Sequence, residues 1–181
     1  NRITITSAAT NTTAISIVGS TTSTTGDGGV FIGYRSAHGS NTGYTLAATG
    51  AGGGISITGT SGTGANALGL RLESMDILAA SGPIDLNSGV NGFILERSYL
   101  GARASTSVTS STSNITLTGN NLLLGTSNNT AVLTTGTLTM QPTANSSFSS
   151  AFTIPSTFSF GQGASGITGL TLGRSGNTSA I

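Results

Sequence analysis

Charged side chains are the residues of this chain that could do chemistry, and most of them lie in one stretch. The sequence has six arginines, five acidic residues, no lysine and one histidine. Seven of the eleven charged residues fall between positions 71 and 103: Arg71, Glu73, Asp76, Asp85, Glu96, Arg97 and Arg103. Paired carboxylates can work as general acid and base, so this charged cluster is the candidate site.

The charged cluster permits an enzymatic and a structural interpretation. If LGLRLE (68–73) and NGFILE (91–96) occupy successive turns of a repeat, their glutamates stack near Arg71 and Arg97. Such a face is similar to that of β-helical enzymes that cleave polysaccharides, which makes a lyase or hydrolase the alternative function. The same side chains could instead form an ion-paired ladder between turns, or a subunit contact. We favour the structural interpretation and predict no enzyme, because the loops are short and rich in small residues.

Other site chemistries find little support in the sequence. His38 lies in SAHGSNTG without cysteine or acidic neighbours, and Asp27 in TGDGG is a single carboxylate, too few for a calcium loop. The chain has no cysteine and a net charge of +1. We therefore predict no metal, no cofactor and no nucleic-acid partner, since phosphate binding needs clustered cations.

The segments that must position these residues are predicted to be short strands. Apolar and small polar residues alternate with a period of two, as in RITIT (2–6), AISIV (14–18), GISIT (54–58) and NITLT (114–118). Clusters rich in Gly, Asn, Ser and Thr separate them and favour turns over helix. We predict an all-β protein without significant helix.

A repeated unit of strand, glycine-rich turn and strand indicates how the strands pack. AISIVGS leads to GGVFIGYRS, GISITGT leads to LGLRLES, and GPIDLNS leads to NGFILERS. Each unit is too small and one-sided to fold alone, so neighbouring units must stack to cover the aliphatic stripe. We predict a parallel β-helix (β-solenoid) of roughly six to nine rungs, at roughly 20 to 30 residues each. An antiparallel sandwich is the alternative architecture.

The predicted coil divides into three parts. Residues 1–141 read as solenoid rungs, 142–160 as a Pro- and Phe-rich interruption, and 161–181 as resumed solenoid. We expect the aromatic side chains near the interruption to form a local core rather than a contact with another chain: Phe148, Phe152, Phe158 and Phe160. Because the chain starts at Asn1 without methionine, we expect a piece of a longer repeat protein.

Three segments carry a resemblance to a known family. GISITGTSGTGANALGLRLES, NITLTGNNLLLGT and the stretch from VLTTGTLTM at 132 to the end resemble the strand repeats of filamentous-haemagglutinin-type exoproteins. The resemblance implies a right-handed parallel β-helix, export across a Gram-negative outer membrane by a partner transporter, and display outside the cell.

The sequence and the resemblance together predict a structural and adhesive role. We expect an extracellular, low-charge fibre protein that self-associates end to end or laterally and binds a cell surface or glycan receptor. Ice or crystal-surface binding would need complete Thr-x-Thr ranks, yet other strands present Ser16 with Val18 or Asp85 with Asn87.

Overall fold

The described part of the chain is built from β-strands alone. The computed structural model describes residues 3–33, 43–64, 66–103, 106–108, 110–125, 130–143, 148–149, 154–160 and 166–174. Within them lie sixteen strands and no helix. This confirms the predicted all-β class.

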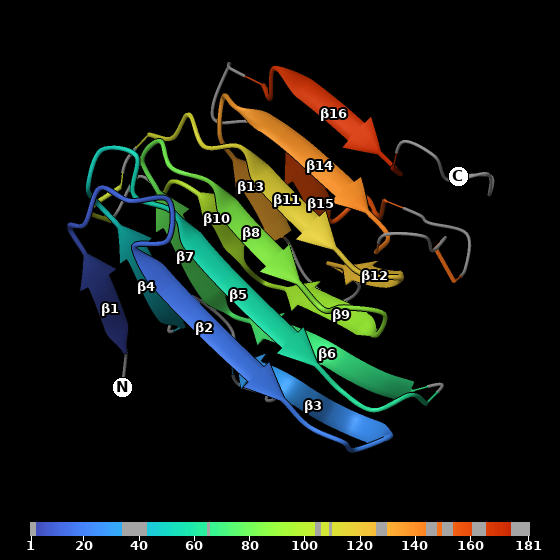
Figure 1. The fold of residues 1–181 in the computed structure, drawn as a ribbon. Helices are drawn as coiled ribbons and strands as arrows, with labels where there is room; N and C mark the ends of the chain where they lie inside the picture. The colour runs from blue at the N-terminus through green and yellow to red at the C-terminus, as the bar shows by residue number, and fades with distance from the viewer. Residues whose placement is uncertain are drawn as a thin grey trace.

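The strands form three sheets (Figure 1). Sheet A consists of β1 (Thr4–Ser7), β4 (Tyr44–Ala48), β7 (Met75–Ala79), β10 (Tyr99–Gly101), β13 (Thr130–Leu133) and β15 (Phe158–Phe160). Sheet B consists of β2 (Ile15–Ser20), β5 (Ile55–Thr60), β8 (Ile84–Asn87), β11 (Ile115–Thr118), β14 (Thr137–Gln141) and β16 (Gly169–Leu172). Sheet C consists of β3 (Thr25–Ile32), β6 (Asn66–Glu73), β9 (Gly92–Glu96) and β12 (Asn121–Leu124).

Every pairing between described strands is parallel. From β1 to β12 the chain visits sheets A, B and C in turn, so the pairs within this part join strands that are three places apart along the chain. Parallel neighbours cannot be joined by a tight hairpin and need a longer connection, which the other two sheets supply here. The antiparallel sandwich is therefore the wrong alternative.

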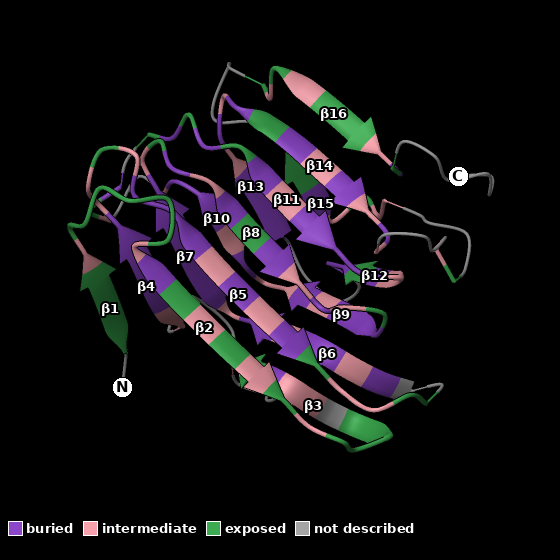
Figure 2. Cartoon of the chain, viewed as in Figure 1, coloured by how far each residue is buried: buried purple, intermediate pink, exposed green. Residues whose placement is uncertain are grey.

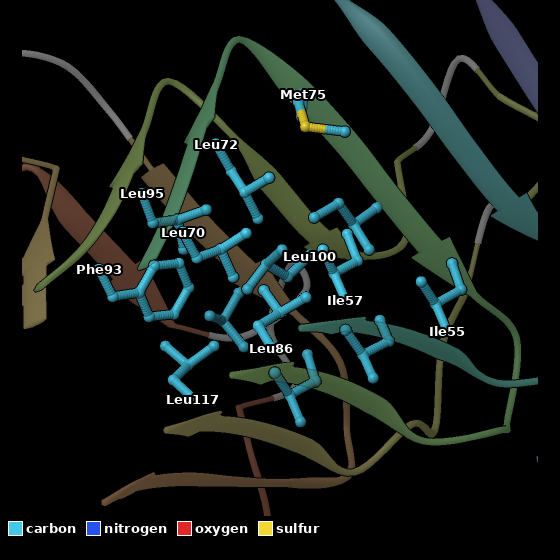
Figure 3. Close-up of a cluster of buried hydrophobic side chains, with 14 of the residues drawn as sticks. Ile55, Ile57, Leu70, Leu72, Met75, Leu86, Phe93, Leu95, Leu100 and Leu117 are labelled. Carbon is cyan, nitrogen blue, oxygen red and sulfur yellow. The ribbon is translucent and has the colours of Figure 1, made fainter. Parts of the chain in front are cut away.

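In-register columns of aliphatic side chains hold the sheets together. The residues of one column of sheet B are Ile15, Ile55, Ile84, Ile115, Leu138 and Leu170. Side chains from all three sheets meet in one core (Figure 3). Burying one such side chain contributes about 1.5 to 3 kcal/mol, so the repeated columns offset the entropy cost of ordering a glycine-rich chain.

The spacing between paired residues along the chain is less regular than predicted. Ile15 pairs with Ile55 after 40 residues, Ile84 with Ile115 after 31, and Ile115 with Leu138 after only 23. The strands keep their register while the connections between them vary in length, because the columns depend on the strands alone.

Glycine permits sheets B and C to meet at close range. A Cβ atom added to Gly59 at the end of β5 would lie 2.0 Å from the carbonyl oxygen of Gly69 in β6. No side chain fits there, so the backbones of the two sheets touch directly. At the corresponding position after β8, Ser88 is fully buried, and its hydroxyl donates to the carbonyl oxygens of Thr118 and Asn91.

Sheet A is covered on both faces near its centre. All five residues of β7 are buried. Ala47 and Leu78 point away from the main core and form a second apolar cluster with Ala102 and Val108. The residues after β10 thus lie over the outer face of sheet A, a covering that strand alternation alone did not predict.

The third sheet ends earlier than the other two. Among the described strands sheet C stops at β12, whereas sheets A and B continue to β15 and β16. Met140 on β14 is nevertheless fully buried. Phe148 and Ile154 pack against the same core, so they cover part of the interior where no described strand of sheet C does.

Candidate functional site

The first ion pair lies on the outer face of sheet C. Leu70 and Leu72 of β6 point into the core, so the residues that alternate with them, Arg71 and Glu73, point outward. Arg71 donates from Nε and Nη2 to Glu73 Oε1 at 2.8 and 2.5 Å. The guanidinium also lies 5.7 Å from the centre of the Phe31 ring.

The two glutamates of the cluster are neighbours in register, because the two charged motifs occupy adjacent strands. Glu73 of β6 lies opposite Glu96 of β9, and Arg71 lies opposite Ile94. Glu73 is 1% exposed, and its Oε2 has no hydrogen-bond partner among the described residues. The acid that the sequence placed in a candidate catalytic pair is therefore enclosed and bound to arginine.

The corner after each glutamate has an unusual backbone. Ser74 and Arg97 have φ angles of 55° and 51°, in the left-handed region that residues with a Cβ seldom adopt. Each of these residues follows the paired glutamate and turns the chain from sheet C into sheet A. The Nε of Arg97 is buried without a hydrogen-bond partner in the described structure.

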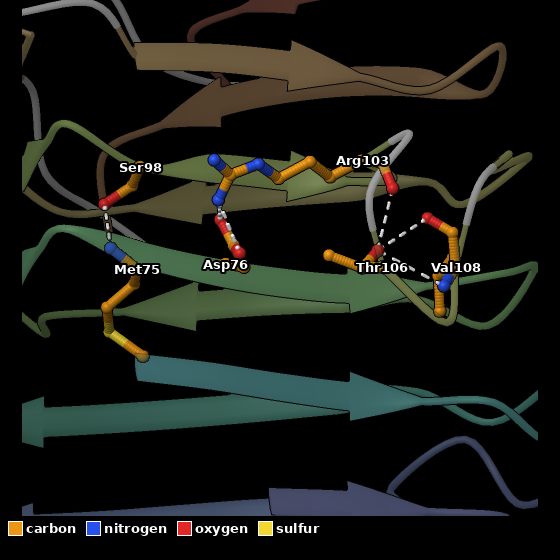
Figure 4. A network of polar contacts seen from close by, with 6 residues as sticks. All are labelled: Met75, Asp76, Ser98, Arg103, Thr106 and Val108. Carbon is orange, nitrogen blue, oxygen red and sulfur yellow. Dashed lines mark hydrogen bonds and ion pairs between the residues drawn. The ribbon is translucent and has the colours of Figure 1, made fainter. Parts of the chain in front are cut away.

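The second ion pair connects sheet A to the segment that covers it (Figure 4). Arg103 Nη1 donates to both carboxylate oxygens of Asp76, at 2.8 and 2.7 Å. Its guanidinium lies 4.6 Å from the centre of the Tyr99 ring, and Tyr99 is the in-register neighbour of Asp76. The backbone N–H of Arg103 donates to the carbonyl oxygen of Val108 and closes the same segment.

Asp85 lies apart from both ion pairs. It is exposed on the outer face of sheet B, in a polar in-register column: Ser16, Ser56, Asp85, Thr116, Thr139 and Thr171. The stretch that looked like one charged cluster is therefore distributed over the outer faces of three sheets.

Two of the acidic residues, Glu73 and Asp76, are poorly placed for acid-base chemistry. A general acid or base must reach its substrate, whereas Glu73 and Asp76 are both buried and both held by arginine. Among the described residues no group of three acidic or histidine side chains could hold a metal ion. His38 lies outside the described residues, and so does Phe152.

The remaining predicted aromatic residues lie near the end of the described core. Phe158 is buried, and its ring meets that of Phe160 edge-on, with centroids 5.1 Å apart. Phe148 is partly buried against the same core, and Phe160 is 37% exposed.

One surface was missed in the sequence. The outward positions of sheet C form an in-register column across all four strands, which we name the sheet C ridge: Phe31, Arg71, Ile94 and Leu123. The signal was present as three successive apolar residues in VFI (30–32), FIL (93–95) and LLL (122–124). A strand with one polar face would alternate instead.

Comparisons of the chain with family models, with curated proteins and with solved structures return no match. The likeness to filamentous-haemagglutinin-type repeats therefore stays a prediction from the sequence. No helix among the described residues has the length and apolar character needed to span a membrane.

Proposed function

We propose that the chain is part of a right-handed parallel β-helix and serves as a structural, adhesive fibre outside a bacterial cell. Three sheets visited in turn suit a continuous coil of six turns, one for each strand of sheets A and B. The right hand is the one that parallel crossover connections adopt in nearly all proteins. The extracellular location, an outer-membrane export partner and a cell-surface or glycan receptor rest on the family resemblance.

The observation that carries the fibre proposal is the exposure of core columns on the last strands of the sheets. Ile5 on β1 and Leu170 on β16 belong to inward columns yet are 48% and 46% exposed. β2 has one buried residue and β16 has none, whereas each strand between them in sheet B has at least two (Figure 2). Exposed strand edges with apolar side chains are templates for further parallel strands.

The outer surface suits a fibre rather than an enzyme. Sheet B presents mainly hydroxyl side chains with one acid, and both arginine-carboxylate pairs are enclosed. A nearly neutral surface leaves little repulsion between stacked copies.

Electron microscopy of the purified 181-residue chain tests the proposal. We expect filaments with an axial repeat of about 4.8 Å, the spacing of strands across a sheet. Leu170→Lys places a charge in the exposed column and is expected to shorten the filaments at least tenfold. Thr171→Lys changes the neighbouring outward residue of the same strand and is the matched control.

Single particles of unvarying length at every concentration would contradict the fibre proposal. Release of reducing ends from polysaccharides by such particles would instead support the alternative function at 71–103.

A further inference from the structure

The outer faces of the three sheets differ, and only one of them is both apolar and exposed within the described residues. Sheet A is covered near its centre by residues that follow β10. Sheet B carries mainly serine and threonine. On sheet C the two ends of the ridge, Phe31 and Leu123, are 39% and 37% exposed. An outward column that crosses all four strands of sheet C with apolar side chains on three of them is not explained by the core of this chain.

The charge within the ridge is already compensated. Arg71 is neutralised by Glu73 and lies against the Phe31 ring, so little unpaired charge has to lose water when the ridge is covered. Aromatic and arginine side chains are enriched where proteins meet. The polar groups of a sugar would find few open partners here, which favours a protein surface as the occupant.

We infer that the sheet C ridge pairs with the same ridge of a second copy, with the two coils antiparallel. In an antiparallel pair Phe31 faces the opposite Leu123, and Arg71 faces the opposite Ile94, so every contact has an apolar member. In a parallel pair Arg71 would face a second arginine. The net charge of +1 adds little long-range repulsion.

The column beside the ridge, which contains Glu73 and Glu96, does not obstruct this pairing. Gly33 and Gly125 directly follow Ile32 and Leu124, the last paired residues of β3 and β12, and they have no side chains. Glu73 is buried and held by Arg71, so the half-buried Glu96 of one copy opposes a neutralised carboxylate of the other.

The pairing should be weak for one short coil and stronger for a long one. The ridge crosses four strands, a length of about 15 Å at the usual strand spacing. A strip of that length and one side chain in width has far less area than the roughly 800 Å² that each partner buries in a stable interface. Repeated contacts along two coils add by avidity, so the ridge would determine how filaments bundle rather than whether they form.

Sedimentation of the Leu170→Lys variant, in which end-to-end stacking is blocked (the end-blocked protein), tests the pairing separately from the fibre proposal. The biological role of the pairing rests on that proposal. In the Leu170→Lys background we expect a concentration-dependent dimer. Adding Leu123→Lys should weaken it at least tenfold, while adding Thr139→Lys on the outer face of sheet B should not. Circular dichroism checks that each variant keeps its β structure. A protein that stays monomeric at millimolar concentration overturns the inference.

Spin labels at single cysteines then test the orientation, because the natural chain has no cysteine. In an antiparallel pair, labels at Ile94→Cys are offset along the coil by one strand spacing, and labels at Phe31→Cys by three, about 15 Å. We expect the Phe31→Cys distance to be clearly longer. Equal distances would overturn the antiparallel pairing.

The two proposals can fail independently. If the end-blocked protein forms dimers but the natural chain forms no filaments, the pairing through the sheet C ridge is supported and the fibre proposal is contradicted. Single, unbundled filaments without dimers would do the opposite.

Discussion

At the scale of single residues, side chains stabilise this fold mainly by pairing buried charges and by fitting the space that is open to them. Asp76 is a carboxylate buried on the outer face of sheet A, and Arg103 reaches it from the covering segment. A buried carboxylate without its partner is costly, whereas a buried pair contributes little net stability compared with apolar residues of similar size.

Replacement of the arginine tests this balance. We expect Arg103→Met to lower the free energy of unfolding by about 3 to 5 kcal/mol, because it leaves Asp76 buried and unpaired. Arg174→Met, at an exposed arginine, should change it by less than about 0.5 kcal/mol. Urea unfolding followed by circular dichroism measures both values.

The double variant Asp76→Leu with Arg103→Met separates charge from packing. Recovery of most of the lost stability is expected, since no buried charge remains. A double variant as unstable as Arg103→Met alone would show that contacts of the arginine stem, rather than its charge, stabilise the covering segment.

At the scale of elements, the meeting of sheets B and C depends on residues without side chains. Gly59 and Gly69 allow two backbones to touch, and a carbonyl oxygen occupies the place where a Cβ would stand. The alternating pattern of β5 predicts its buried face but does not show that its C-terminal end approaches another strand.

Gly59→Ala is expected to destabilise the fold by about 3 kcal/mol, because the methyl group would lie 2.0 Å from a carbonyl oxygen and the strands must separate. Gly166→Ala is the matched control, since a Cβ there meets no atom within 4 Å. Denaturation midpoints give the comparison, and equal midpoints for the two variants would argue against the close contact of β5 with β6.

At the scale of the whole molecule, stability should fall from the centre towards the last strands. Central strands such as β7 and β8 have neighbours on both sides, whereas β1 and β16 each pair with one described strand. In stacked repeats each unit is stabilised mainly by its neighbours.

Hydrogen exchange of the unassembled protein should therefore be fastest in β1 and β16 and slowest in β7 and β8. Assembly into filaments should protect the outermost strands most, because they would gain partners. Uniform exchange along the dispersed chain would contradict this view, and unchanged exchange of β1 after assembly would contradict end-to-end stacking.

The sequence alone determined the strand class and much of the core. Alternation in GISIT and NITLT marked Ile55, Ile57, Ile115 and Leu117 as inward, and all four are buried. The repeated units also placed LGLRLE and NGFILE on neighbouring strands. These features are local or repeat in a fixed order along the chain, so they can be predicted from a single sequence.

Only the tertiary structure decided which charges meet and which faces stay open. Arg103 bonds Asp76 across 27 positions because the chain folds back over sheet A, and no spacing rule encodes such a covering. Asp85 joins neither pair because its strand belongs to another sheet. Alternation tells inward from outward on a strand, but whether an outward side chain is covered depends on segments that pack there from elsewhere in the chain.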